Sequence, residues 1–350
     1  MQRCKVVKSN VRALQPLHRV VCRNHRSKHA ELYRNTLGSD EAAMPARFRG
    51  LSVFGWLIVA LAAASVETHA QDLEPRAFAN TPVGLNFLIG GYAYSKGTVG
   101  TDASVPLEDT EVRLNSAVLA YVRTLDLWGR SGKFDVILPY TWASGSATLV
   151  GQPRKRDVSG LGDPRFRFSM LLYGGPALSL DEFRDFQPDV IIGTSLEVTA
   201  PLGQYDSDKL LNIGTNRWSF KPEIGVSKTL GPLTLELATG VRFYTDNNDF
   251  LDGQTLQVSP IYSVQSHLIY SFTPGMWVGL DGLYYTGGRP TIDGKKGETR
   301  ANARVGLTLT LPVNRYNSVK LYGSTGVYTK TGTDFDLVGV VWQFRWGGGL

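Results

Sequence analysis

Cysteine and histidine, which supply most nucleophilic and metal sites in proteins, are scarce in this chain of 350 residues, with two cysteines and five histidines. Both cysteines lie within residues 1–43, and His267 is the one histidine beyond residue 70. A segment without cysteine offers no disulfide, no thiolate metal site and no cysteine nucleophile. Because hydrolytic and metal chemistry also relies on histidine, the composition beyond residue 70 argues against an enzyme, a metal site and a cofactor.

Long apolar runs are equally scarce. None occurs after residue 70, and the run before it, residues 51–64, is shorter than the roughly 20 apolar residues of a membrane-spanning helix. Arg47 and Arg49 precede this run, and the small residue Ala70 ends the polar stretch that follows it. This three-part layout predicts a secretory signal peptide over residues 44–70, cleaved after Ala70. A retained membrane anchor is the alternative interpretation.

Residues 1–43 do not fit a secretory leader, because a signal peptide begins near its initiator methionine. Met44 stands at that position, so residues 1–43 are interpreted as an upstream extension outside the native protein, with a disordered basic tail as the alternative. They contain nine Lys/Arg and three Asp/Glu, and residues 44–70 contain two Arg and one Glu. Of the whole chain's net charge of +6, residues 71–350 therefore carry −1. Nucleic acid is not an expected partner, since its binding requires clustered Lys and Arg.

Apolar and polar residues alternate with period two beyond residue 70, in segments of about 10–14 residues bounded by Gly, Pro, Asn and Asp. That length suits a tilted strand that crosses the hydrocarbon of a membrane, whereas soluble strands average about 5–6 residues. Twelve strands are predicted, an even number as in bacterial outer-membrane barrels. Their expected spans are 83–95, 110–124, 133–142, 164–173, 188–200, 216–229, 232–245, 254–272, 275–286, 298–311, 317–329 and 335–346.

The alternation is clear in residues 217–228, 299–311 and 111–123, each of which has an apolar face opposite a polar or charged face. In residues 111–123 the expected lipid-facing side consists of Val112, Leu114, Val118, Ala120 and Val122. A soluble sandwich alternates too, with its apolar faces inward. The outward arrangement is favoured here because tight connections alternate with long polar ones, as in outer-membrane barrels.

The connection over residues 174–187 is long although its position predicts a short turn. It is expected to contain a short helix, unless a strand is miscounted there. Aromatic residues are expected to form interfacial belts, since amphipathic rings favour the membrane–water boundary. The residues assigned to these belts are Trp128, Trp142, Trp218, Trp277, Trp342, Trp346, Tyr140, Tyr244, Tyr284 and Tyr285. Residues 71–350 are thus predicted to form an all-β, transmembrane, antiparallel up-and-down β-barrel of about 12 strands in the outer membrane of a Gram-negative cell.

Residues 73–87 (LEPRAFANTPVGLNF) resemble the start of the outer-membrane "meta-pathway of phenol degradation" family. So do residues 160–164 (GLGDP), 201–205 (PLGQY) and 212–218 (NIGTNRW). The resemblance covers essentially residues 71–346. It implies a transporter-type barrel, often encoded near genes of aromatic degradation, and it implies no established substrate and no catalytic residue.

Charged residues in the strands fall on the polar face. An Arg or Lys that faces lipid at mid-membrane costs about 2–4 kcal/mol, so these side chains are expected to line the lumen, with cations in excess. The predicted lumen-lining residues are Glu111, Arg113, Arg123, Arg165, Arg167, Glu197, Lys221, Glu223, Glu236, Arg242, Asp281, Arg300, Arg304, Lys320 and Arg345.

Three functions remain open. The leading interpretation is a channel for passive passage of small solutes, with aromatic and anionic ones as candidates, and the alternative is a structural or surface-interaction barrel with a plugged lumen. An outer-membrane lipid hydrolase is remote, since His267 shares its phase with Ser263 and Gln265 but has no carboxylate nearby in sequence. The expected partners are outer-membrane lipid and lipopolysaccharide, the solute, and the outer-membrane assembly machinery. The assembly machinery would recognise the alternating last segment, which ends in Trp346.

Overall fold

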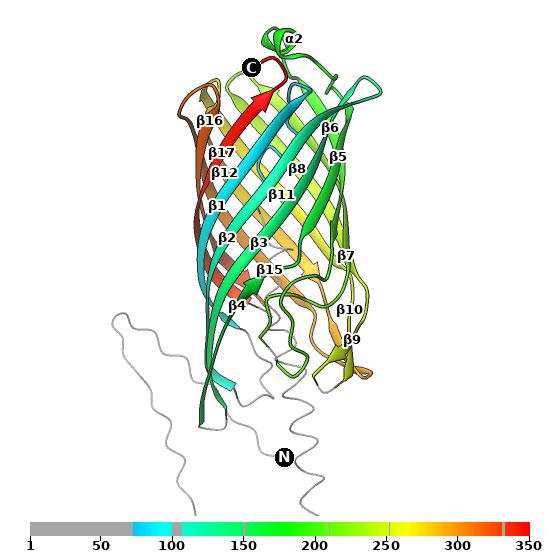
Figure 1. Ribbon diagram of the computed structural model, residues 1–350, viewed down its shortest axis with the longest axis vertical. Coiled ribbons are helices and arrows are strands. Elements are labelled where there is room, and N and C mark those ends of the chain that lie inside the picture. The colour runs from blue at the N-terminus through cyan, green and yellow to red at the C-terminus, as the bar shows by residue number, and fades with distance from the viewer. Residues whose placement is uncertain (1–72, 100–106, 150–151, 210, 252, 331–332) are drawn as a thin grey trace, which may run out of the picture. The chain divides into compact units, whose positions relative to one another are not determined.

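The computed structural model describes residues 73–99, 107–149, 152–209, 211–251, 253–330 and 333–350. The predicted upstream extension and signal peptide lie outside these residues. Within them the predicted antiparallel barrel is confirmed (Figure 1), and its wall has twelve strands. They are β1 (Leu85–Val99), β2 (Leu107–Leu127), β3 (Arg130–Leu149), β5 (Arg165–Tyr173), β6 (Val190–Thr199), β7 (Ser219–Leu230), β8 (Leu233–Tyr244), β11 (Ile261–Thr273), β12 (Met276–Gly287), β15 (Arg300–Pro312), β16 (Asn317–Thr329) and β17 (Thr333–Gly347).

The wall closes because its first and last strands pair. β1 and β17 run antiparallel in an unbroken register from Leu85 opposite Gly347 to Val99 opposite Thr333. Every other strand pairs with its neighbours in chain order. Closure leaves no free edge with unpaired backbone groups, which is what a β-structure in lipid requires. Among the described residues, no helix is long and apolar enough to cross a membrane.

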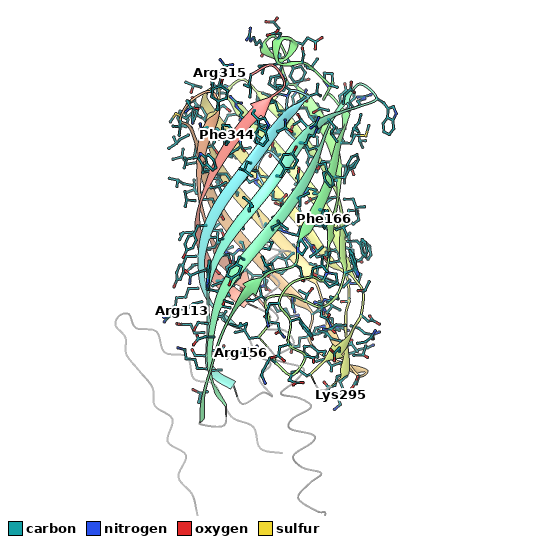
Figure 2. The ribbon with its side chains drawn as sticks, in the orientation of Figure 1. Arg113, Arg156, Phe166, Lys295, Arg315 and Phe344 are labelled. Carbon is teal, nitrogen blue, oxygen red and sulfur yellow. The ribbon has the colours of Figure 1, made fainter. Side chains whose placement is uncertain are left out.

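The outer face of the barrel is apolar, as the alternation predicted. On β2, β12 and β15, Leu119, Leu280 and Leu307 expose 52%, 56% and 58% of their surface. In water such exposure would cost about 25 cal/mol per Å² of apolar area, whereas the hydrocarbon of a membrane accommodates it. Figure 2 shows the side chains that cover this face, among them Phe166 midway along the barrel.

One strand has the opposite phase to the one expected. On β2, Leu114 and Ala120 are buried on the inner side, and Leu119 and Leu138 are opposite each other on the outer side. Glu111, Arg113 and Arg123 share the phase of Leu119, so the prediction that they line the lumen is wrong. The misassignment arose because this strand has small apolar residues on both faces. Its charges lie near the strand ends, where exposure costs roughly 0–1 kcal/mol; Figure 2 shows Arg113 toward the end away from α2.

The end of the barrel with short turns contains the expected helix. The connection between β5 and β6 includes α2 (Leu180–Arg184), which begins with a capping box. The Ser179 hydroxyl accepts from the Glu182 backbone, and the Glu182 carboxylate accepts the Ser179 N–H at 2.8 Å. The Ser179 hydroxyl also donates to the Glu182 carboxylate at 2.8 Å. The hydrogen bonds that this carboxylate accepts from the Ser179 backbone and side chain lower the pKa of Glu182. By the rule that periplasmic turns are short, we interpret this end as periplasmic.

The opposite end is more ordered than the predicted loops. β3 continues past the wall and pairs with β4 (Gln152–Leu161), which lies in a segment expected to be a loop. The predicted strand over 254–272 is divided at Pro260, which has no N–H for a ladder. A separate small sheet caps this end around Phe250, Leu256 and Ile292. Its strands are β9 (Asn247–Phe250), β10 (Gln254–Val258), β13 (Pro290–Ile292) and β14 (Lys295–Lys296).

Candidate solute pathway

The inner face of the barrel is polar and charged. Three of the fifteen residues expected there lie on the outer face, as described above. The register and burial place the other twelve on the inner face: Arg165, Arg167, Glu197, Lys221, Glu223, Glu236, Arg242, Asp281, Arg300, Arg304, Lys320 and Arg345. Lys133 and Asp135 of β3 also face inward, although no role was predicted for them. Their alternation with Phe134, which is exposed on the outer face, is the sequence signal that indicates this.

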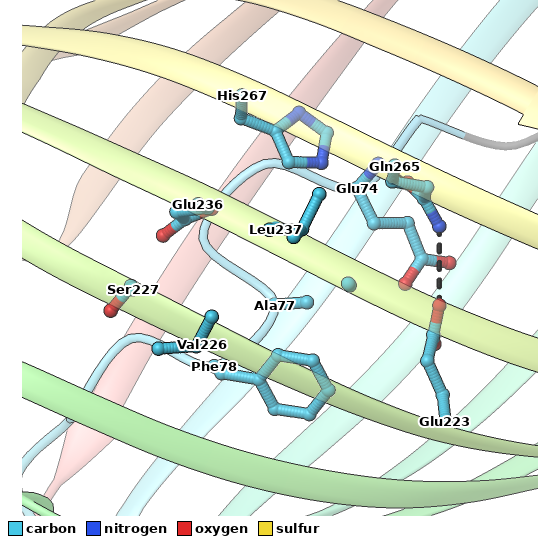
Figure 3. Close-up of a pocket in the computed structure, with 11 residues that line it drawn as sticks. Glu74, Ala77, Phe78, Glu223, Val226, Ser227, Glu236, Leu237, Gln265 and His267 are labelled. Atoms are coloured by element: carbon cyan, nitrogen blue, oxygen red, sulfur yellow. Dashed lines mark hydrogen bonds between the residues drawn. The ribbon is translucent and has the colours of Figure 1, made fainter.

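Residues 73–84 run inside the barrel before the chain enters β1. At one end Leu73 packs on Ile261, Leu283 and Tyr285 of the inner wall. At the other end, at the short turns, the Val83 N–H donates to the Leu178 carbonyl oxygen at 2.9 Å. Figure 3 shows this segment passing along the inner faces of the strands. No sequence pattern predicted this segment, because residues 73–82 have no strand period and precede the first predicted strand.

The first anchor of this lumen segment is an ion pair. Arg167 on β5 forms a fork with the Glu74 carboxylate, one guanidinium nitrogen to each oxygen. Arg167 also donates to Glu197 on β6 at 2.9 Å, and Glu197 accepts from Arg242 on β8 at 2.8 Å. Arg165 lies 3.9 Å from Glu197. Fork-shaped Arg–carboxylate pairs are among the strongest hydrogen-bonded contacts in proteins, so this chain of contacts fixes the segment across several strands.

The second anchor surrounds Arg76. Its backbone N–H donates to the Glu236 carboxylate at 2.7 Å, and its guanidinium donates to the Ser271 hydroxyl at 2.7 Å. The same guanidinium lies 5.0 Å from the ring of Trp277, within the range of a cation–π contact. Trp277 is therefore buried inside the barrel, and its assignment to the interfacial belt is wrong. Lys133 completes the anchor by donating to the Ala77 carbonyl oxygen at 2.6 Å.

The third anchor is aromatic. The ring of Phe78 packs on Leu171 and Ile191 and lies against Gly193 and Gly225. A Cβ atom at Gly193 would lie 2.4 Å from the ring, and one at Gly225 would lie 2.5 Å from it. Both distances are too short for any side chain, so glycine is required on β6 and β7 to form this niche.

His267 has a carboxylate partner that sequence proximity did not indicate. It is opposite Asp281 in the register of β11 and β12, and its Nδ1 lies 2.7 Å from Asp281 Oδ1. The other Asp281 oxygen accepts from the Thr308 hydroxyl at 2.7 Å. Tyr285, also on β12, is buried on the inner face and so does not belong to the interfacial belt, whereas Tyr284 is exposed on the outer face.

A small cavity remains between the lumen segment and the wall (Figure 3). Its lining includes Glu74 and Phe78 of the segment and Glu236 and His267 of the wall. Val226 of β7 and its partner Leu237 of β8, both exposed on the outer face, border the same cavity. The segment therefore narrows the lumen and leaves this small cavity beside it.

A protein-family model described as "Putative MetA-pathway of phenol degradation" matches residues 90–340. The chain belongs to this phenol-degradation family. No curated protein matches this chain. Among solved structures, the COG4313 outer membrane channel from Pseudomonas putida F1 has a TM-score of 0.67 at 19% identity, covering 79% of this chain and 100% of that one. At that identity the likeness shows the fold alone.

Two autotransporter domains are also similar. The transport unit of AIDA-I from Escherichia coli has a TM-score of 0.49 at 7% identity, covering 81% of this chain and 97% of that one. The β domain of BrkA from Bordetella has a TM-score of 0.46 at 11% identity, covering 75% of this chain and 100% of that one.

Three of the four sequence motifs that resemble the phenol-degradation family meet at one buried carboxylate. Asp163 of the GLGDP motif accepts from the Gly203 N–H at 2.8 Å, from the Thr215 N–H at 2.8 Å and from the Thr215 hydroxyl at 2.7 Å. Gly203 and Thr215 belong to the PLGQY and NIGTNRW motifs. We call this contact the Asp163 knot. It ties three loop segments together at the mouth of the barrel opposite α2.

Tyr205 links the same motifs to the small capping sheet. Its hydroxyl donates to the Asp249 carbonyl oxygen at 2.9 Å and accepts from the Asn247 side chain at 2.8 Å. Burial raises the pKa of Tyr205, so the phenol stays neutral and keeps its proton for the first of these bonds. Asn247 is fully buried, so its contacts here are structural.

Proposed function

We propose that the protein is an outer-membrane channel for passive passage of small solutes, aromatic and anionic ones among them, through a lumen that residues 73–84 narrow. The observation that supports it is the way this lumen segment is held. All of residues 73–84 are described, and none belongs to a strand. The segment is attached to the wall mainly through side chains, so it can shift without breaking the barrel's hydrogen-bonded ladder.

The width of the barrel is consistent with this proposal. Eight strands leave room for side chains only, whereas sixteen to eighteen leave an open aqueous channel. Twelve strands leave an intermediate space, and here the lumen segment and long inward side chains occupy much of it. Small solutes are therefore the class that fits. Inward-facing arginines and lysines would favour anions over cations of equal size.

Liposome swelling tests the proposal with the folded, full-length protein. We expect uptake of small monocarboxylates by the wild type, and faster uptake by the double variant Glu74→Gln, Arg76→Gln, which weakens two anchors of the segment. The matched control is Arg113→Gln, on the outer face, which is expected to leave the rate unchanged. If neither the wild type nor the double variant admits any small solute, the channel is excluded.

A second candidate is a barrel without transport, which the same anchors favour. The Glu74–Arg167 pair and the Phe78 niche hold the segment across the lumen, and a permanently seated segment would block it. Such a protein would act through its surface. Uptake that appears only in the double variant would support this candidate, because it would mean that the native segment is a plug.

The proposed setting follows from the outer face and the last strand. The exposed apolar belt would be in contact with outer-membrane lipid, and the capping sheet would lie at the level of lipopolysaccharide. β17 ends in the stacked rings of Trp342, Phe344 and Trp346, the kind of aromatic strand end that the assembly machinery would engage. Export would use the signal peptide predicted over residues 44–70.

A further inference from the structure

We propose that the lumen contains a binding site for an arylalkanoate, a carboxylate joined to a phenyl ring by a short aliphatic chain, and that the chain's own Glu74 and Phe78 occupy it in this structure. The inference rests on the proposed function, since a channel brings such a solute to the site. It names one solute class in place of separate aromatic and anionic candidates.

The carboxylate end of the site is cationic. Four cations of the wall, on β5, β7 and β8, are joined to two wall carboxylates by ion pairs; they are Arg165, Arg167, Lys221 and Arg242, against Glu197 and Glu223. The wall alone therefore has an excess of two positive charges here, and the Glu74 carboxylate reduces the excess to one. Glu74 is bound through the planar fork of Arg167. Any carboxylate of similar reach satisfies the same fork.

The phenyl end of the site is the niche that holds Phe78. Gly193 and Gly225 leave the inner wall without side chains at this point, and the ring fits against their backbones. Leu171 and Ile191 complete the apolar contact, and only 6% of Phe78 is exposed. A flat slot lined by glycine backbone and aliphatic side chains suits a phenyl ring and offers no ion pair of its own.

The two ends lie on the same strands at a spacing that fixes the ligand's length. Arg167 and Leu171 are four residues apart on β5, and Gly193 and Glu197 are four residues apart on β6. Four residues of a strand span about 13 Å, and the long Arg167 side chain covers part of that distance. A phenyl ring and a carboxylate separated by a few methylenes, as in 4-phenylbutyrate, bridge this gap better than benzoate.

The native occupant competes with any solute because it is tethered. Residues 73–84 continue directly into β1, so Glu74 and Phe78 are presented to the site at a high effective concentration, of millimolar order for a short tether. We therefore expect the wild type to bind an arylalkanoate weakly. Binding should tighten when the native groups are removed and the wall is left intact.

Calorimetric titration of the folded full-length protein in detergent with 4-phenylbutyrate tests this site. The double variant Glu74→Gln, Phe78→Ala should bind it at least about tenfold more tightly than the wild type, a change of about 1.4 kcal/mol. In that background Arg167→Gln should remove the gain. Lys320→Gln, the matched control at an inward lysine on β16, should not. A double variant that binds no more tightly than the wild type would overturn the proposal.

Ligand controls separate the two ends of the site. Butyrate lacks the ring and 4-phenylbutanol lacks the charge, so each should bind the double variant at least about tenfold more weakly than 4-phenylbutyrate. Equal binding of butyrate would reduce the site to a general anion patch and overturn the proposal. In the double variant, Gly193→Ala places a methyl group in the space left by Phe78. It should weaken 4-phenylbutyrate and leave butyrate unchanged.

Folding and function are checked apart from binding. A heat-dependent shift in gel mobility shows that each variant is a closed barrel. If Arg167→Gln does not show this shift, Arg167→Lys takes its place, because lysine keeps the charge and loses the fork. We expect Arg167→Lys to remove part of the gain in 4-phenylbutyrate binding. Because the titration needs no transport, tight binding without liposome swelling would leave the site standing and refute the channel. Liposome swelling without 4-phenylbutyrate binding would support the channel and refute the binding site.

Discussion

His267 and Asp281 are cross-strand neighbours whose side chains meet inside the barrel wall, with 2.7 Å between Nδ1 and Oδ1. Thr308 of β15 donates to the second oxygen of the same carboxylate. Three strands are thus joined by one buried acid. Asp281 is 2% exposed, so His267 and Thr308, and not water, are the partners of its carboxylate oxygens.

We predict that Asp281→Asn destabilises the barrel more than Thr308→Val. The first substitution replaces one of the two acceptor oxygens with an amide nitrogen, so either His267 or Thr308 loses its acceptor, and leaving such a buried group unpaired costs about 1–3 kcal/mol. The second leaves the His267–Asp281 contact in place. Urea unfolding midpoints of the two variants in detergent measure the difference, and equal midpoints would show that the dyad adds nothing beyond the threonine bond.

The Phe78 niche gives a second prediction. Gly225→Ala should displace the ring and lower the free energy of unfolding by about 1–3 kcal/mol, the usual cost of overpacking. Gly90→Ala is the matched control, because the nearest heavy atom to a Cβ there is 3.8 Å away. If both substitutions are equally mild, the niche is looser than the glycine geometry indicates.

The outward apolar belt gives a third prediction. Leu307 lies on the outer face of β15 opposite Leu280, and both are more than half exposed. Leu307→Arg should cost about 2–4 kcal/mol, because it places a charge in mid-membrane. Arg113→Leu, at the end of β2, should be close to neutral. Folding titrations into lipid vesicles measure both, and a neutral Leu307→Arg would contradict a membrane-facing surface.

A fourth prediction concerns the Asp163 knot. Asp163→Ala removes three hydrogen bonds and leaves the Gly203 and Thr215 N–H groups without their acceptor. We expect protease cleavage within residues 203–215 to become about tenfold faster, since an opening that is about 1.4 kcal/mol easier is ten times more populated. Asp208→Asn, an exposed neighbour, is the control. An unchanged cleavage rate would mean that other contacts hold the loops closed.

The strands of the barrel wall could be predicted from the sequence more completely than the segment that lies in the lumen. Period-two alternation located all twelve strands, because each face of a strand must match either lipid or lumen. It failed on β2, where Val112 and Leu114 gave the inner face the same apolar character as the outer one. It also could not locate β4 or the small capping sheet, whose short strands are stabilised by contacts with distant segments.

The lumen segment lay beyond sequence reasoning for a different reason. Glu74 and Arg76 flank a proline ahead of the first strand and follow no period. Their positions depend on Arg167 and Glu236, which are 93 and 160 residues away along the chain. Trp277 was misplaced for the same reason, because the cation that covers it inside the barrel comes from this segment and not from a neighbouring strand.

The pairing of β1 with β17 has a consequence for biogenesis. The lumen segment continues directly into β1, the strand with which β17 pairs to close the barrel. We expect the segment to lie inside the forming barrel before β1 and β17 pair. A segment that remained outside when β1 and β17 paired would have to pass through the closed barrel, past its inward-facing arginines and lysines, to reach its position in the lumen. We therefore expect the order of assembly to determine whether the segment is enclosed.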